Sequence, residues 1–294
     1  MSSFLKLNFP QWQGGNDLYF QKFVPELTER EQLLPGYHLG SQIINLIFPT
    51  NKFTDTAEVP IPLTESAEDI KTQNGIYAYN ACLRNLKAAV KIVEEKKPDK
   101  VVTIGGECSV SVPAFTYFAN KHQGKIAIVW IDAHPDIGMP GDAYTGYHAM
   151  ALAMCMGMGD EKFVQSVKGK VPVENCLLVG LRSMEKEAKE RKEKIGLKHI
   201  TCEEFRNDNN KVIEWLKGTK AEKVLIHLDL DVLDPADLYV ADGYEINGMK
   251  LKEVADCINL ISKNYDVVGF TVAERMPVHD IRLRNMFGSL NLFK

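Results

Sequence analysis

Six short apolar runs, each followed by polar or turn-forming residues, constrain the fold of this chain more than any other feature. They lie at residues 43–48, 101–104, 126–131, 176–181, 224–230 and 267–272. The runs are almost continuously apolar, so strands made from them would carry apolar side chains on both faces. Strands of that kind occur in parallel sheets that lie between two layers of helices.

Stretches with helical spacing separate these runs. One contains Leu83, Leu86, Val90 and Val93 on a single face and should end before Pro98, because proline stops a helix. The alternation of strands and helices predicts an α/β fold, a three-layer α/β/α sandwich with a mainly parallel sheet. Further helical stretches contain Val212, Trp215 and Leu216, and then Leu251, Val254, Ile258 and Ile261.

The chain shows no internal repeat and no long linker rich in proline, glycine or serine. We therefore expect residues 1–294 to form a single domain. Prolines and glycines are frequent from about Phe9 to Gly40. We expect residues 1–40 to be an N-terminal lead-in that packs on the sheet.

The composition indicates which classes of partner the protein can bind. The 39 acidic and 35 basic residues give a formal net charge of −4, without a block of lysine or arginine, which favours a small-molecule ligand over nucleic acid. We find neither a signal-peptide pattern nor an apolar run of membrane length, so we expect a cytoplasmic protein with no membrane partner. The six cysteines are dispersed without a Cys-x-x-Cys pair, which is typical of reduced thiols.

Acidic and histidine residues gather where two of the apolar runs end. The first group is Asp132, His134 and Asp136, and the second is Asp229 and Asp231. Ligands bind beyond the carboxyl ends of parallel strands, so we expect both groups to meet in one crevice. Carboxylates that converge in this way repel one another unless cations lie among them. The two groups therefore predict a pair of divalent metal ions.

Both groups resemble a known pattern. Residues 132–136, Asp-Ala-His-Pro-Asp, and residues 229–235, Asp-Leu-Asp-Val-Leu-Asp-Pro, are similar to the two metal-binding motifs of the ureohydrolase superfamily, which includes arginase, agmatinase and formimidoylglutamase. The resemblance covers about residues 36–277. It implies a parallel sheet of about eight strands, a binuclear manganese site, a small-molecule substrate and a homo-oligomer, either a trimer or a hexamer.

The resemblance also implies the metal ligands. Asp132 and Asp229 would bridge the two ions. His134 and Asp231 would complete one ion, and Asp136 would bind the other together with a residue of the turn Gly-Gly-Glu-Cys-Ser, where the family has histidine and this chain has cysteine. The full set of expected ligands is Cys108, Asp132, His134, Asp136, Asp229 and Asp231.

The implied reaction is hydrolysis of a linear C–N bond in a guanidino or formimidoyl compound by a metal-bound hydroxide. Glu274 matches the family glutamate that pairs with the guanidinium. His148 resembles the histidine that shuttles protons, and Asp231 is a second candidate for that role. Besides Glu274, the substrate contacts that we expect are Thr145, Tyr147 and Glu185.

Two departures from the family pattern bear on substrate and metal. Gly138 and Tyr147 stand where arginases carry asparagines that contact the substrate carboxylate, so the sequence does not predict L-arginine as the substrate. A coordinating Cys108 would be a soft thiolate, which favours zinc or iron over manganese and adds negative charge. The site would then hold two ions with altered preference, or one ion on the His134 side, or bind metal only weakly. Alternatively, Cys108 is a buried thiol that binds no metal.

Two alternative functions follow from these departures. If the Cys108 side holds no ion, Asp132, His134 and Asp229 would supply the ligands of a one-metal amide hydrolase similar to histone deacetylases. A non-catalytic binding protein that keeps the scaffold would also fit the altered loops. Glu274 and the intact second motif favour an enzyme.

Overall fold

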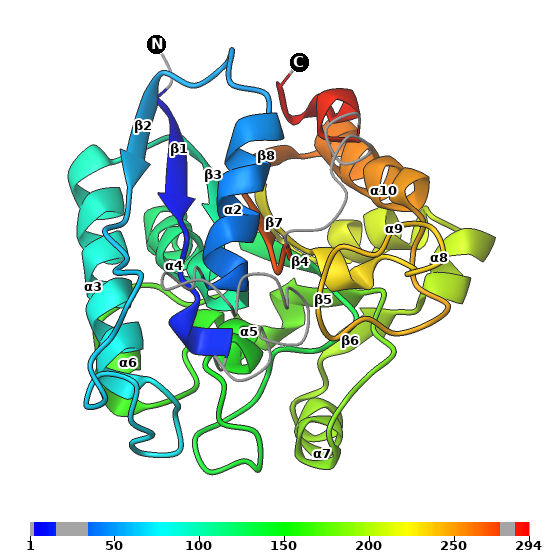
Figure 1. Cartoon of the computed structure of the whole chain (residues 1–294). Helices are drawn as coiled ribbons and strands as arrows, with labels where there is room; N and C mark the ends of the chain where they lie inside the picture. Colours follow the sequence, from blue (N-terminus) through cyan, green and yellow to red (C-terminus); the bar gives the residue numbers. More distant parts are fainter. Residues whose placement is uncertain (1–2, 16–34, 277–285, 294) are drawn as a thin grey trace.

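The computed structural model describes residues 3–15, 35–276 and 286–293. Within them, eight strands form one sheet in the order β2-β1-β3-β8-β7-β4-β5-β6 (Figure 1). All neighbouring strands pair in parallel, which confirms the predicted parallel sheet. The strands are β1 Phe4–Phe9, β2 Asp55–Glu58, β3 Lys100–Gly105, β4 Ile126–Ile131, β5 Cys176–Val179, β6 Lys198–Ile200, β7 Lys223–Asp229 and β8 Asp266–Ala273.

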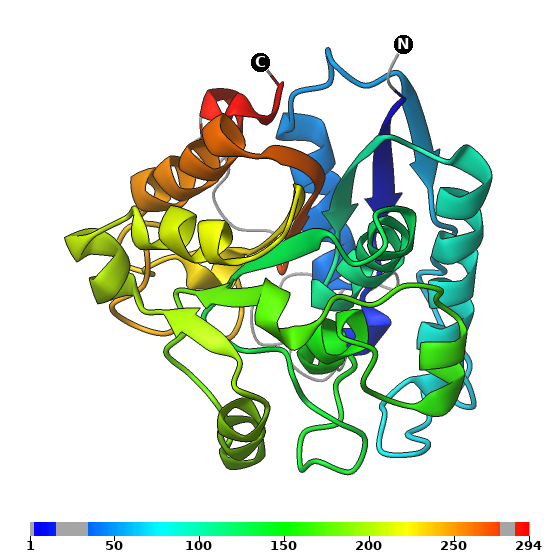
Figure 2. The same cartoon turned by 180° about the vertical axis from the view of Figure 1, so that it is seen from behind.

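Helices cover both faces of this sheet. One face packs against α3 to α6 (Figure 2), and the other packs against α2 and α8 to α10 (Figure 1). The three-layer α/β/α prediction is confirmed. The helices are α2 Gly36–Ile47, α3 Tyr79–Lys96, α4 Val112–Lys121, α5 Ala151–Cys155, α6 Glu161–Gln165, α7 Lys186–Ile195, α8 Cys202–Asn207, α9 Lys211–Gly218 and α10 Leu251–Asn264.

Strand β4 shows why its sequence is continuously apolar. Ile126, Ile128 and Trp130 belong to the core on the α3–α4 side, whereas Ala127, Val129 and Ile131 belong to the core on the α9–α10 side. Successive side chains of a strand point to opposite faces, and here both faces are dry. All six residues are fully buried.

The prediction of a strand at residues 43–48 is wrong, because this run lies in α2 and the residue after it. Ile44 is 1% exposed and Leu46 is 83% exposed, so the run buries one helical face instead of two sheet faces. The other five apolar runs coincide with β3, β4, β5, β7 and β8, and the three predicted helices are α3, α9 and α10.

The expectation of an N-terminal lead-in is also corrected in part. Phe4–Phe9 is β1, which lies inside the sheet between β2 and β3. Lys6 and Asn8 interrupt its apolar pattern, and the Lys6 Nζ donates to Asn45 Oδ1 of α2 at 2.8 Å. Residues 16–34 of the predicted lead-in lie outside the described residues. In the described ranges, no helix has the length and apolar character needed to cross a membrane.

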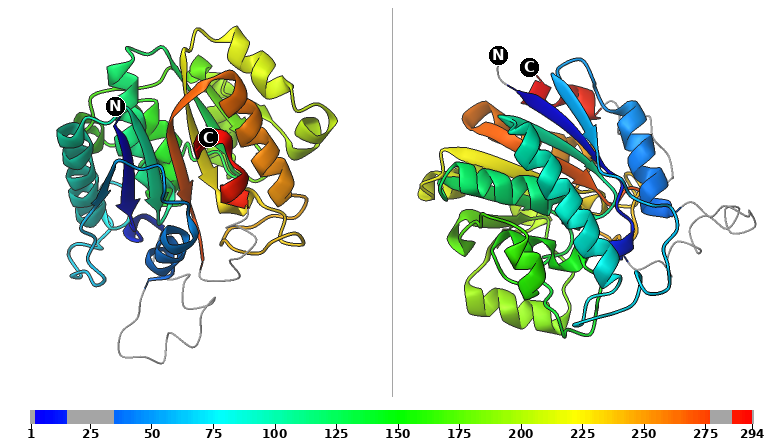
Figure 3. Two further views of the ribbon diagram at one scale, coloured as in Figure 1. Left: turned by 90° about the horizontal axis from the view of Figure 1, so that it is seen from above. Right: turned by 90° about the vertical axis from the view of Figure 1, so that its left-hand side faces the viewer.

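The four central strands β3, β8, β7 and β4 end at the same edge of the sheet, which Figure 3 shows from two further directions. Short 3-10 helices lie just after two of these strands. Leu230–Val232 follows β7 directly, and Cys108–Ser111 begins after two residues that follow β3, Gly106 and Glu107. The segments after β3, β4, β7 and β8 are therefore brought together although they are far apart in sequence.

The turn after β3 requires glycine because it passes close to the end of β1. A Cβ at Gly106 would lie 1.7 Å from the backbone oxygen of Gln11. Gly106 N donates to Phe9 O at 3.0 Å, and Gly106 O accepts from Glu274 N at 2.7 Å. The turn thus links the exits of β1, β3 and β8.

We predict that Gly106→Ala lowers the free energy of unfolding by about 1–3 kcal/mol, because backbone must move to admit the methyl group. Urea denaturation measures the change. Gly218→Ala in α9 is the control, since a Cβ there meets no atom within 4 Å, and it should be neutral or slightly stabilising. Equal stability of the two variants would contradict the close approach at Gly106.

Candidate metal centre

A cavity of ≈ 320 Å³ opens at the carboxyl edge of the sheet. Its size and converging polar groups are typical of a small-molecule site. The described part of its lining contains no lysine or arginine. The lining carries eight acidic residues, namely Asp136, Asp142, Glu185, Glu187, Asp229, Asp231, Asp242 and Glu274.

One group of possible metal ligands combines Asp132, His134 and Asp231, whose ligand atoms all lie within 4.8 Å of one another. His134 Nδ1 lies 2.7 Å from Asp231 Oδ2. Asp231 Oδ1 accepts from Ala133 N at 3.1 Å, and Asp132 Oδ1 accepts from His134 N at 2.6 Å. The exits of β4 and β7 are therefore held together by the same carboxylates that would bind an ion.

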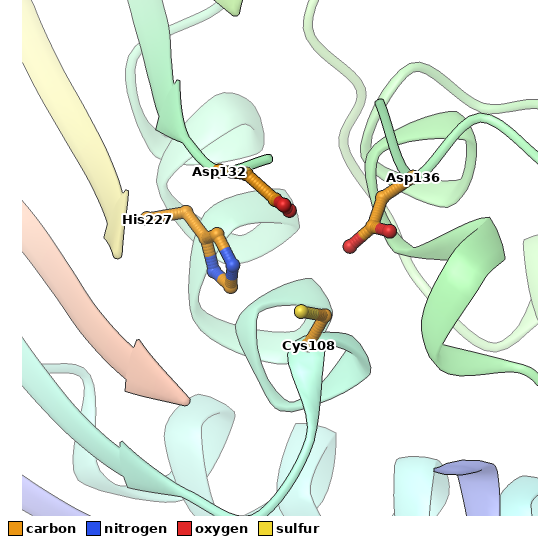
Figure 4. A group of neighbouring side chains, drawn as sticks. All are labelled: Cys108, Asp132, Asp136 and His227. Carbon is orange, nitrogen blue, oxygen red and sulfur yellow. The ribbon is translucent and has the colours of Figure 1, made fainter. Parts of the chain in front are cut away.

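A second group combines Cys108, Asp132, Asp136 and His227, again with ligand atoms within 4.8 Å of one another (Figure 4). All four side chains are buried. Cys108 also belongs to a third group with Asp229 and Glu274, and its Sγ lies 2.9 Å from Asp229 Oδ2. Asp132 is shared between the first two groups, as expected for a carboxylate between two ions.

Burial without a cation raises the pKa values of these acids. Burial raises the pKa of Asp132 and of Asp229 well above the usual range, and the charge of Asp231 raises both further. Burial likewise raises the pKa of Asp136 to about 7. Burial would also raise the pKa of Asp231, but the charge and hydrogen bond of His134 outweigh it and lower that pKa. A divalent ion would stabilise the charged forms of all four.

Burial and nearby negative charges also act on the pKa of the Cys108 thiol. Burial raises its pKa well above the usual value, and the charges of Asp136 and Asp229 raise it further. Without an ion, the thiol is therefore protonated. A bound metal ion would deprotonate it, as it does for any coordinating thiol.

Two residues of the site have backbone conformations that are rare outside glycine. Asp136 has φ 47° and Glu274 has φ 64°. Asp136 O accepts from Leu152 N and Ala153 N at 2.9 and 3.1 Å, and Glu274 N donates to Gly106 O. These bonds hold both strained residues with their carboxylates at the cavity, and such strain is concentrated at functional sites.

Glu274, His148 and Tyr144 form a chain of hydrogen bonds along the cavity. His148 Nδ1 lies 3.0 Å from Glu274 Oε1, and its Nε2 lies 2.7 Å from the Tyr144 hydroxyl. Burial alone would lower the pKa of His148, but the charges of Tyr144 and Glu274 outweigh it and raise this pKa well above the usual value. The imidazole therefore carries a proton next to the cavity.

The structure brings together all six expected metal ligands with His148 and Glu274, but not all expected substrate contacts. Glu185 is exposed at the cavity, whereas Thr145 and Tyr147 are not part of its lining. Tyr147 is 1% exposed and packs on Phe163, with ring centroids 4.7 Å apart. The nearby Tyr144, in contrast, lines the cavity.

His227 was not among the ligands expected from the sequence. It lies two and four residues before Asp229 and Asp231, and a period of two places alternate residues of a strand on one side. That spacing was the available signal. Glu107, for which the sequence predicted no role, lies in the turn after β3. Its carboxylate accepts from Ser109 N at 2.7 Å and from Gln11 Nε2 at 2.5 Å, so it fixes the turn after β3.

Comparisons with known proteins agree with this geometry. The model of the Arginase family matches residues 29–287. The arginase of Bacillus subtilis (strain 168) is 29% identical over 235 residues, 77% of this chain and 77% of that protein. Arginase 2, chloroplastic/mitochondrial, of Arabidopsis thaliana is 28% identical over 200 residues, 67% of this chain and 54% of that protein, so the match spans about half of the plant relative.

The fold is similar to solved structures as well. The structure of arginase from Bacillus caldovelox aligns with a TM-score of 0.81 at 20% sequence identity, covering 100% of this chain and 98% of that chain. At this identity the likeness shows the fold. The family model, by contrast, spans most of the sequence and includes every candidate ligand. The chain therefore belongs to the arginase family.

Proposed function

We propose that this protein hydrolyses a C–N bond of a guanidino compound with the help of two divalent metal ions. The position of Glu274 carries the proposal. Its carboxylate lines the cavity, and one of its oxygens lies within 4.8 Å of the ligand atoms of Cys108 and Asp229. A guanidinium presents paired N–H donors that a carboxylate binds strongly. Glu274 would therefore hold the reacting carbon beside the ions.

The donor set fits two divalent ions. Asp132, His134 and Asp231 would hold one, while Cys108, Asp136 and Asp229 contribute to the other, with Asp132 shared. Asp136 Oδ2 is buried and has no hydrogen-bond partner among the described residues, which suits a metal ligand. When bound, such ions supply an activated water nucleophile at neutral pH.

His148 is the better candidate for moving the proton to the leaving amine. It lines the cavity, holds a proton, and bonds directly to Glu274, which would bind the substrate. Asp231, the other candidate, already accepts from Ala133 N and faces His134 Nδ1 with its second oxygen. We therefore assign Asp231 to metal binding and His148 to proton transfer.

The lining favours a substrate with a positive or neutral far end. Glu185, Glu187 and Asp242 lie at the cavity, while Asp142 forms an ion pair with Arg191, at 2.7 Å between Arg191 Nη2 and Asp142 Oδ1. The described lining has no cationic side chain of lysine or arginine to bind a carboxylate. A guanidino amine fits these charges better than L-arginine does.

The proposal predicts release of urea from at least one member of a panel of guanidino amines, guanidino acids and formimidoyl compounds. Turnover should be highest for guanidino amines, because the acidic lining attracts their second positive charge. Urea and formamide assays measure the products. Cleavage of amides alone, with one ion bound per chain, would instead support a one-metal amide hydrolase.

Glu274→Gln tests the assigned role on the preferred substrate of that panel. Loss of the charged partner of the guanidinium should lower kcat/KM by about 100-fold or more. Glu185→Gln is the matched control, because Glu185 is exposed, and it should cost less than about 10-fold. A Glu274 variant that behaves like the control would contradict the role of Glu274.

The stabilisation of the protein by added metal should depend on pH. The pKa of Asp136 is raised to about 7 in the folded protein, so its contribution to metal-free stability is present below about pH 4 and lost as the pH rises through about 7. Metal binding requires the ionised form. The increase in Tm produced by added Mn²⁺ or Zn²⁺ should therefore be larger at about pH 8 than at about pH 5. Differential scanning fluorimetry measures it, and equal increases would contradict the prediction.

A further inference from the structure

We propose that His227 is a metal ligand, and that with Cys108, Asp132 and Asp136 it forms a mixed sulfur, nitrogen and oxygen site that prefers zinc-like ions to manganese. This inference rests on the proposed function only in that metal ions occupy the cavity. It does not depend on which substrate is hydrolysed. It assigns a function to a buried histidine that takes no part in the reaction steps described above.

The four side chains converge from three separate segments. Cys108 lies in the turn after β3, Asp132 and Asp136 follow β4, and His227 lies within β7. In Figure 4 the imidazole points toward the sulfur and the two carboxylates. Their ligand atoms lie within 4.8 Å of one another, so small side-chain movements would bring each to the roughly 2.0–2.3 Å that zinc requires.

The two nitrogens of His227 have different surroundings. Nδ1 lies 2.8 Å from Ser111 Oγ. Nε2 is buried and has no hydrogen-bond partner among the described residues. The side chain is 0% exposed, and its ring stacks on Trp130 at 3.6 Å between centroids with 13° between planes. The ring is thus fixed in orientation, with one nitrogen satisfied and the other directed at the cluster.

A buried nitrogen that has neither a hydrogen-bond partner nor a metal ion lowers the stability of the folded protein. A histidine that binds metal through one ring nitrogen usually donates the other N–H to a fixed acceptor, which sets its tautomer and orientation. Here Nδ1–H would donate to the Ser111 hydroxyl and Nε2 would bind the ion. Asp136 Oδ2, also without a partner in the described ranges, belongs to the same cluster.

The location of His227 also explains how cysteine can replace histidine at position 108. Cysteine stands in the turn after β3 where the family pattern has histidine, and this chain instead places an imidazole on β7, which β8 separates from β3 in the sheet. The imidazole of His227 and the small thiol of Cys108 both belong to the one cluster of possible ligands. The exchange keeps a nitrogen donor and adds a sulfur donor to the set.

The resulting site differs from the Asp132, His134 and Asp231 group, which offers two carboxylates and one imidazole. Thiolate and imidazole ligands favour Zn²⁺, Co²⁺ or Fe²⁺, whereas carboxylate-rich sets suit Mn²⁺. The two positions should therefore differ in metal preference, with the softer ion on the Cys108 and His227 side.

Titration of the full-length, metal-free protein with Co²⁺ and with Zn²⁺ tests the inference. The wild-type protein should develop a thiolate-to-cobalt absorption band with the first equivalent. His227→Gln should weaken zinc binding at this position by at least about 100-fold, since loss of even an outer partner of a ligand costs 10–100-fold. His199→Gln, at an exposed histidine of β6, is the control and should match the wild type.

A relocation variant covers the case in which His227→Gln does not fold. Cys108→His combined with His227→Ala keeps the total side-chain volume similar and returns the imidazole to the turn. It should bind Zn²⁺ within about 10-fold of the wild type and show no thiolate band. X-ray absorption of the wild-type protein with one equivalent of zinc should show sulfur at about 2.3 Å together with imidazole.

Unchanged zinc affinity and cobalt spectra in His227→Gln would overturn the inference, as would a zinc shell without imidazole. These readouts are independent of turnover. If the cobalt and zinc results hold and no guanidino compound is cleaved, the proposed function fails while the ligand assignment stands. If guanidino hydrolysis is found and the metal readouts do not change in the variant, the ligand assignment fails alone.

Discussion

The mutual repulsion of buried carboxylates at the carboxyl edge of β4 and β7 is the constraint on which the rest of this structure depends. Asp132, Asp229 and Asp231 are 0%, 2% and 4% exposed and lie close enough to raise one another's pKa or to require a positive partner. His134 is a basic partner of two of them, with its Nδ1 2.7 Å from Asp231 Oδ2 and 3.7 Å from Asp132 Oδ1. Such a cluster is stable when cations occupy it or when protons neutralise it. The acidic cavity, the strained backbone at Asp136 and Glu274, and the glycine turn after β3 all surround this cluster.

The scaffold produces this cluster through the order of its strands. β3, β8, β7 and β4 are neighbours in the sheet although they are separated in sequence, and each contributes one polar segment to the same edge. Close backbone contact at Gly106 ties the β1 and β8 exits to the Cys108 turn. The strands thus position the candidate ligands, while longer loops would surround a substrate, which is where members of one fold family differ in specificity.

Much of this arrangement was predictable from sequence. Continuous apolar runs predicted the buried strands, because burial on both faces leaves a strong pattern. The acidic and histidine residues at the ends of two runs, together with the resemblance to the ureohydrolase motifs, predicted the candidate metal ligands and Glu274, which the structure places at one edge of the sheet. The edge strands β2 and β6 and the interrupted strand β1 left no such pattern, since their residues alternate or are exposed. Residues 43–48 were predicted as a strand because an amphipathic helix can also contain a short apolar run. Side-chain direction in loops has no periodic signal, so Tyr147 was assigned to a cavity that it does not line. His227 was not recognised because it lies within an otherwise apolar strand.

If the carboxylate cluster is a centre for two divalent ions, the purified protein should contain them. Elemental analysis of protein purified without chelators measures this. We expect about two divalent ions per chain, at least one of them zinc, iron or cobalt when these metals are available, because a thiolate would contribute to one position. A folded protein that contains no divalent metal, and binds none when Mn²⁺ and Zn²⁺ are added, would contradict this expectation.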